Sequence, residues 1–138
     1  MQLIFYYASG GIHPQLQRPV FYASAAVLPN QEGGDRYDLY ACSVLIAIAQ
    51  TPASCDRLMK AIASVEAGAD TSIVEGGNDV LLNIDASGIQ VDILANDEWV
   101  GQPDSRFTLQ EWRKILDKWK YLLGLPKDSE DVILLTLP

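Results

Sequence analysis

The sequence is poor in the residues that carry most enzyme chemistry. It has a single histidine, His13, which lies in a loop rich in glycine and proline with no neighbour suited to acid–base catalysis. Its glycine pairs are isolated and form no phosphate-binding loop, and Cys42 and Ser43 belong to no nucleophile motif. We therefore expect no catalytic residues, no bound cofactor and a protein that is not an enzyme.

Cysteine is also scarce. Cys42 and Cys55 are too few for a disulfide framework and do not have the spacing of zinc ligands. We expect ordinary thiols in a reducing compartment, with Cys55 on the core-facing side of a helix. The sequence leaves open whether Cys42 and Cys55 ever form a disulfide. The acids between positions 79 and 85, and the pair Asp97 and Glu98, suggest calcium ligands, but their spacing does not match an EF-hand loop. A solvated acidic surface is the preferred interpretation, and we predict no metal site.

Long apolar runs are missing. The longest apolar stretch, residues 39–49, is far shorter than the roughly 20 residues of a transmembrane helix. The first ten residues have neither the basic segment nor the apolar run of a signal peptide. We therefore expect a cytoplasmic protein with no membrane partner. With 138 residues, 49% of them hydrophobic, the chain fits a single domain over residues 1–138 that needs no metal or disulfide.

Basic residues are absent from one contiguous third of the chain. Residues 61–105 contain no Lys or Arg but nine acids, so this block accounts for the whole negative excess behind the net charge of −8. The nine acids are Glu66, Asp70, Glu75, Asp79, Asp85, Asp92, Asp97, Glu98 and Asp104. Such a surface would repel nucleic acids and anionic membranes and would attract a cationic partner.

Several segments have the composition of strands. β-Branched and aromatic residues indicate strands over residues 2–8 and 19–28, and a short aliphatic run indicates a last strand over residues 132–137. Residues 37–49 are ambiguous, because their β-branched residues fit a buried strand whereas their alanines and their length also permit a helix. We choose the strand.

Two helices have clear start signals. Thr51 is placed to cap a helix that ends near Gly68, and a capping box begins at Thr108. The apolar stripe of the second helix includes Trp112 and Trp119, which we assign to the core. The resulting order, β-β-β-α-β-β-α-β, predicts an α+β fold in which an antiparallel or mixed sheet has two helices packed on one face.

Residues 79–94 form the clearest hairpin, with the turn at residues 85–88. Period-two alternation places the aliphatic side chains on one face and mostly polar, negative side chains on the other. In the acidic loop that follows, Trp99 fits two interpretations equally: an interface anchor, or an aromatic side chain that folds back to cover the end of a helix. The predicted partner-binding residues are Asp79, Asn83, Asp85, Gln90, Asp92, Asp97, Glu98, Trp99 and Asp104.

The hairpin over residues 79–93 (DVLLNIDASGIQVDI), the acidic loop and the helical segment that begins with FTLQEW at residue 107 resemble small bacterial immunity proteins. Those proteins neutralise the toxins of polymorphic-toxin and contact-dependent inhibition systems in the cytosol. The resemblance covers about residues 75–125. It implies a cognate toxin as the partner, often a nuclease whose basic cleft an acidic surface would plug, and it transfers no functional residue.

Two other classes stay open. Type III secretion chaperones resemble the chain in size, acidity and α+β character and act as dimers, but they usually begin with a helix, whereas this sequence opens with a strand-like segment. The oligomeric state is unknown from the sequence, and an obligate dimer that buries a sheet or helix face would favour the chaperone. A small enzyme that uses carboxylates alone is the third class, and it would require a deep pocket lined by acids of raised pKa.

Overall fold

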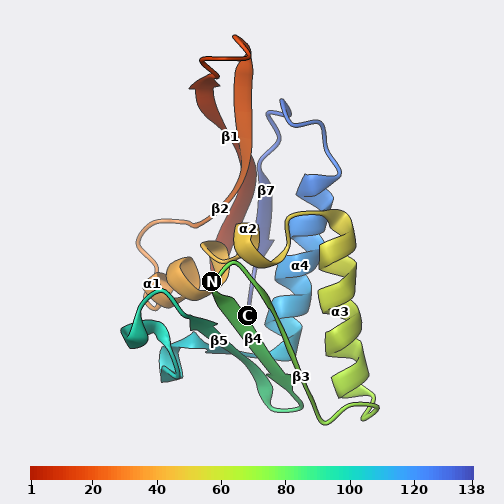
Figure 1. The fold of residues 1–138 in the computed structure, drawn as a ribbon. Coiled ribbons are helices and arrows are strands. Elements are labelled where there is room, and N and C mark those ends of the chain that lie inside the picture. Colours follow the sequence, from red (N-terminus) through yellow and green to blue (C-terminus); the bar gives the residue numbers. More distant parts are fainter.

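Two antiparallel sheets and two long helices make up the fold in the computed structural model, which describes residues 1–138 (Figure 1). The first sheet has the order β2-β1-β7, with β1 (Gln2–Ile12), β2 (Pro19–Val27) and β7 (Ile133–Thr136). The second sheet has the order β3-β4-β5-β6, with β3 (Ser72–Gly77), β4 (Val80–Asp85), β5 (Gly88–Ile93) and β6 (Arg106–Phe107). The predicted α+β class is confirmed, but the strands form two sheets instead of one.

The two long helices begin at the predicted caps. In α3 (Pro52–Glu66), the Thr51 hydroxyl accepts the backbone N–H of Ser54 at 3.1 Å. In α4 (Leu109–Leu123), the Thr108 hydroxyl accepts the N–H of Glu111 at 3.0 Å, and the Glu111 carboxylate accepts the N–H of Thr108 at 3.0 Å, which completes the capping box. No helix in the structure combines the length and the apolar character required to cross a membrane.

Residues 37–49 are helical, so the strand predicted there is wrong. They are divided between the end of α1 (Gly34–Tyr37), the π-helix η1 (Asp38–Cys42) and α2 (Leu45–Ile48). A strand would place Val44, Ile46 and Ile48 on one face. Instead Val44, Leu45 and Ile48 are buried, while Ile46 is 54% exposed, which is the spacing of a helix. The burial of one helical face of this segment outweighs the strand preference of its β-branched residues.

The strand β3 was not predicted, because its glycine pair reads as a turn. It forms a continuous antiparallel ladder with β4 from Ser72 opposite Asp85 to Gly77 opposite Val80. A Cβ at Gly76 would lie 2.3 Å from the carbonyl oxygen of Val80, so only glycine fits this approach of the two backbones. Gly76 and Gly77 are therefore the last two residues of strand β3 and do not form a turn.

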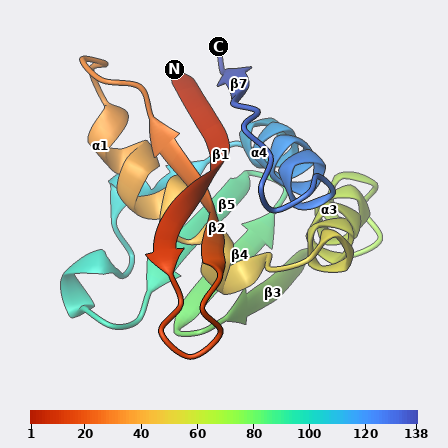
Figure 2. The ribbon, with the colours of Figure 1, turned by 90° about the horizontal axis from the view of Figure 1, so that it is seen from above.

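One hydrophobic core of 27 buried residues joins the two sheets and the helices. Helix α4 contacts β1, β7 and β5, and α3 packs beside α4 against β3 and β4 (Figures 1 and 2). Trp112, Trp119 and Cys55 are fully buried, as predicted from their helical spacing. The aliphatic face of the β4–β5 hairpin is also buried, through Val80, Leu82, Ile84, Ile89 and Val91.

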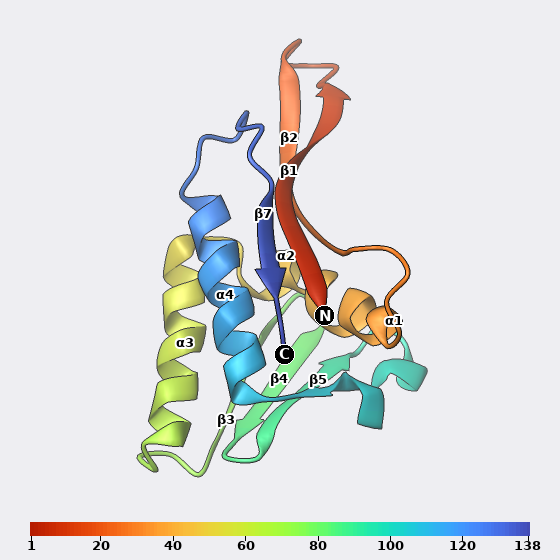
Figure 3. The same ribbon diagram turned by 180° about the vertical axis from the view of Figure 1, so that it is seen from behind.

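The β1–β2 hairpin projects beyond the rest of the molecule (Figures 1 and 3). Strand β7 pairs only with residues 2–5 of β1, so the remainder of the hairpin is a two-stranded arm. At the tip, the Nδ1 atom of His13 accepts the backbone N–H groups of Gln15 at 3.2 Å and Leu16 at 3.1 Å. The single histidine thus stabilises the turn of the arm.

Candidate partner-binding surface

The side of the second sheet that faces away from the core brings four of the predicted polar residues together. The register of β4 and β5 places Asn83 opposite Gln90 and Leu81 opposite Asp92, with Asp85 closing the turn. Asn83, Asp85, Gln90 and Asp92 therefore share one face, as the alternation predicted. All four are half-buried, however, which is more than a freely solvated face would show.

Three of these side chains hold the following loop, residues 94–105, against the sheet. The amide nitrogen of Gln90 donates to the carbonyl of Gln102 at 3.0 Å. The Asp92 carboxylate accepts the backbone N–H of Gly101 at 2.8 Å and the side-chain amide of Asn83 at 3.1 Å. These polar groups are satisfied within the chain, so their first role is to position the acidic loop.

The fourth residue, Asp85, has an internal counterion. Its Oδ1 atom lies 3.3 Å from Nη2 of Arg106 and accepts the backbone N–H of Ser87 at 2.8 Å. The hydrogen bonds from Ser87, helped by the nearby Arg106 guanidinium, hold the pKa of Asp85 below its ordinary value. Arg106 lies just beyond the cation-free block in sequence but opposite Gln90 in the sheet, so it reduces the negative charge of this face.

Four predicted acids have exposed side chains with no basic nitrogen within 4.0 Å. Asp79 lies in the turn between β3 and β4, and its carbonyl accepts the N–H of Leu94 at the start of the acidic loop at 2.7 Å. Asp97 and Glu98 belong to the 3₁₀ turn η2 (Asp97–Trp99), and Asp104 belongs to η3 (Pro103–Ser105). These carboxylates remain available to a partner.

Two further acids, which no sequence pattern indicated, lie beside the acidic loop. Asp35 and Asp38 are exposed on α1 and η1, beside the η3 end of the acidic loop, and form no ion pair. Arg36 connects the two segments, because its guanidinium donates to the carbonyl of Asp104 at 3.4 Å. The same guanidinium lies 4.6 Å from the ring centroid of Tyr37. We name the exposed carboxylates of Asp35, Asp38, Asp97, Glu98 and Asp104 the acidic flank.

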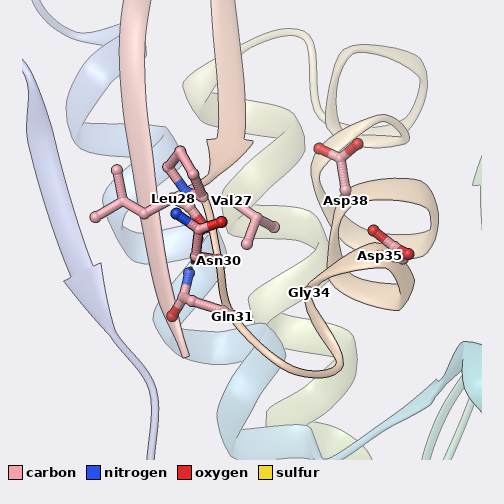
Figure 4. A pocket seen from close by; sticks show the side chains of 8 residues that line it. Val27, Leu28, Asn30, Gln31, Gly34, Asp35 and Asp38 are labelled. Carbon is pink, nitrogen blue, oxygen red and sulfur yellow. Dashed lines mark hydrogen bonds between the residues drawn. The ribbon is translucent and has the colours of Figure 1, made fainter.

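A shallow pocket of about 200 Å³ opens between the end of β2 and α1 (Figure 4). Its lining residues are Val27, Leu28, Pro29, Asn30, Gln31, Gly34, Asp35 and Asp38. The Gln31 amide is fixed on one side, where it donates to the carbonyls of Leu28 at 2.8 Å and Gln2 at 2.9 Å. Asp35 and Asp38 contribute two carboxylates and no basic residue lines the pocket, so it suits a positively charged side chain.

Trp99 packs inward. Its side chain is half-buried against the hydrophobic core, and its backbone N–H donates to the carbonyl of Asn96 at 2.9 Å. The Asn96 side chain also caps this turn by accepting the N–H of Glu98 at 2.9 Å. The structure thus supports the interpretation in which Trp99 folds back, while part of the ring remains at the surface beside the acidic flank.

The two cysteines are buried free thiols. Burial raises the pKa of Cys42 to about 12, with a further increase from the nearby Asp38 carboxylate, and burial raises the pKa of Cys55 to about 11. Both thiols are therefore protonated at neutral pH. No group of three or more His, Cys, Asp or Glu side chains is arranged to hold a metal ion.

The chain matches no protein-family model, no curated protein and no solved structure.

Proposed function

We propose that the chain is a non-catalytic binding protein that recognises a protein partner with a basic surface, and that it acts in the cytoplasm as an immunity protein against a cognate bacterial toxin. The acidic flank carries the proposal, because its five exposed carboxylates form no ion pair within the chain. The resemblance over residues 75–125 suggests the class of partner. A nuclease toxin, whose cleft must be basic to hold a phosphate backbone, has the complementary charge.

Charge complementarity alone would raise the association rate and the specificity of this complex more than its affinity. Exposed carboxylates of one sign accelerate encounter with a basic surface and disfavour acidic competitors. Tight binding needs groups that lose water in the interface. Two neighbouring features can supply them: the pocket beside Asp35 and Asp38, which fits a Lys or Arg side chain, and the exposed part of Trp99.

The proposed surface differs from the nine residues expected from the sequence. It keeps Asp97, Glu98, Trp99 and Asp104 and gains the acids of residues 35–38. Asp79 borders it through the contact with Leu94. The polar hairpin residues support this surface from within, because they hold the loop that carries it.

A matched pair of variants tests the proposal. The flank variant combines Asp97→Asn, Glu98→Gln and Asp104→Asn. The control variant combines Asp128→Asn, Glu130→Gln and Asp131→Asn, which makes the same chemical changes at exposed acids without ion pairs in the loop before β7. Both raise the net charge equally, so only the position of the charge differs.

The measurement is the affinity, between low and high salt, for a partner captured from the native host or encoded beside this chain. We expect the flank variant to bind at least about 10-fold more weakly at low salt and to lose most of the salt dependence, while the control stays close to the wild type. If the two variants bind alike, or if the partner is acidic, the proposal is wrong. Protection of cells that express the captured partner then tests the immunity role.

A secretion chaperone is the second candidate, and one observation favours it. No helix or strand covers the outward face of the first sheet (Figure 3), and such chaperones act as dimers. An obligate dimer that unfolds on dissociation would support the chaperone. A chain that folds as a monomer would support the immunity protein.

A further inference from the structure

The first sheet has one buried face and one uncovered face. Leu3, Phe5 and Leu135 point into the core, on the side where α4 packs. On the opposite side, which faces the viewer in Figure 3, no other element lies over the strands. We name this side the outer face, and the register assigns to it Gln2, Ile4, Tyr6, Ala8, Tyr22, Ser24, Ala26, Leu134 and Thr136.

The composition of the outer face is unusual for a surface in contact with water. The solvated face of an antiparallel sheet is normally polar, with hydrophobic residues only on the core side. Here no residue is charged, and most are aliphatic, alanine or tyrosine. Tyr22 and Leu134 are 52% and 51% exposed. An uncharged and mostly apolar sheet face of this kind is typical of an interaction surface.

The two-stranded arm gives a second reason to expect that another molecule binds the outer face. Beyond residue 5 of β1 only two strands remain, and an isolated two-stranded hairpin is marginally stable in water. Strand β2 has no charged residue after Pro19 that would protect its free edge. Burial of its side chains by another molecule would therefore stabilise the arm.

The total accessible surface area of the chain is larger than that of a compact monomer of the same mass. The chain exposes 7818 Å², whereas a compact monomer of 15.2 kDa exposes roughly 7,100 Å². A projecting two-stranded arm exposes more surface than a compact chain of the same mass, and burial of one of its faces against a partner would reduce this excess.

We propose that the outer face is the interface of a homodimer. Each copy carries a net charge of −8, so most approaches between two copies bring acids together. The outer face carries no charge, and two copies can stack it against itself without that repulsion. A twofold arrangement opposes the same patch on both chains, with the sheets roughly 10 Å apart.

This dimer dissociates into folded chains. The 27-residue core is complete within one copy, so folding does not require the partner. Such a dimer differs from the obligate dimer expected of a chaperone. It is also independent of the proposed function, because the outer face contains no residue of the acidic flank.

The experiment measures mass against concentration by sedimentation, up to about 100 μM, with Tyr22→Glu as the test variant and Tyr121→Glu as the control. Both residues are exposed tyrosines, at 52% and 60%, but Tyr121 lies on α4, away from the outer face. We expect a dimer for the wild type and for Tyr121→Glu, and at least about a 10-fold weaker dimer for Tyr22→Glu, because the interface would bury an unpaired carboxylate.

A second variant, Leu134→Glu, changes the outer face on β7 and leaves the arm intact. Circular dichroism shows whether each variant retains its fold. A wild type that stays monomeric at about 100 μM overturns the proposal, and so does equal dimerisation of folded Leu134→Glu and Tyr121→Glu. Unchanged binding of a basic partner by Tyr22→Glu would leave the proposed function standing in either case.

Discussion

The indole nitrogen of Trp119 donates a buried hydrogen bond to the carbonyl oxygen of Ala49 at 2.6 Å. This bond connects the middle of α4 to the residue that ends α2, across 70 positions of sequence. The other tryptophan of the same apolar stripe, Trp112, is equally buried, but its indole nitrogen has no hydrogen-bond partner. The two tryptophans therefore form a natural comparison.

Trp119→Phe should destabilise the protein more than Trp112→Phe. Both substitutions remove a similar volume from the core, but the first also deprives a buried carbonyl of its donor. We expect an additional loss of about 1–3 kcal/mol for Trp119→Phe in the free energy of unfolding, measured with urea. Equal losses would show that the bond to Ala49 contributes nothing net.

The contact between Tyr37 and Glu111 should make the free energy of unfolding depend on pH in the alkaline range. The Tyr37 hydroxyl donates to the Glu111 carboxylate at 2.5 Å, and burial together with this bond raises the pKa of Tyr37 to about 12. An unfolded tyrosine titrates near 10, so the folded state holds this proton more strongly and stability falls as the pH rises from about 10 to 12. Tyr37→Phe should flatten the fall between those pH values, whereas Tyr121→Phe, on an exposed side chain, should leave it unchanged.

Native protein should react slowly with thiol reagents. Cys42 and Cys55 are buried, and their raised pKa values leave almost no thiolate at neutral pH. We expect labelling by a disulfide reagent at pH 7.5 to be at least about 100-fold slower in the folded state than in urea, where both thiols should react. Fast labelling of the folded protein would mean that one of the segments opens readily.

Asp92→Ala should loosen the acidic loop without unfolding the sheet. The substitution removes the acceptor of the Gly101 N–H, and we expect faster hydrogen exchange in residues 97–104 with a loss of about 0.5–1.5 kcal/mol in stability. Asp128→Ala removes an exposed carboxylate that forms no ion pair and lies outside the acidic loop, and it serves as the control. Equal exchange in the two variants would show that Asp92 does not hold the loop.

Features that depend on a few neighbouring residues could be predicted from the sequence. The cap at Thr51 and the capping box at Thr108 bond groups only three residues apart. The alternation in the β4–β5 hairpin decides which side chains face the core, because neighbouring side chains of a strand point to opposite faces. The burial of Trp112 and Trp119 follows from helical spacing in the same way.

Other features depended on contacts between distant segments. Residues 37–49 contain residues that suit both strands and helices, and only their burial between the sheets selects the helix. Strand β3 ends in two glycines with little strand preference, and it forms because β4 supplies its hydrogen bonds. Local preference was too weak in both segments to decide the outcome.

The sequence by itself determined how many acids the chain has and that they concentrate in residues 61–105. The tertiary structure decided which of them are free, because pairing depends on distance in space. Arg106 forms an ion pair with Asp85, and the backbone N–H of Gly101 donates to the Asp92 carboxylate. Arg36 connects α1 to the acidic loop from 68 positions away. The same long-range folding leaves one sheet face uncovered, which the composition of β1, β2 and β7 alone could not reveal.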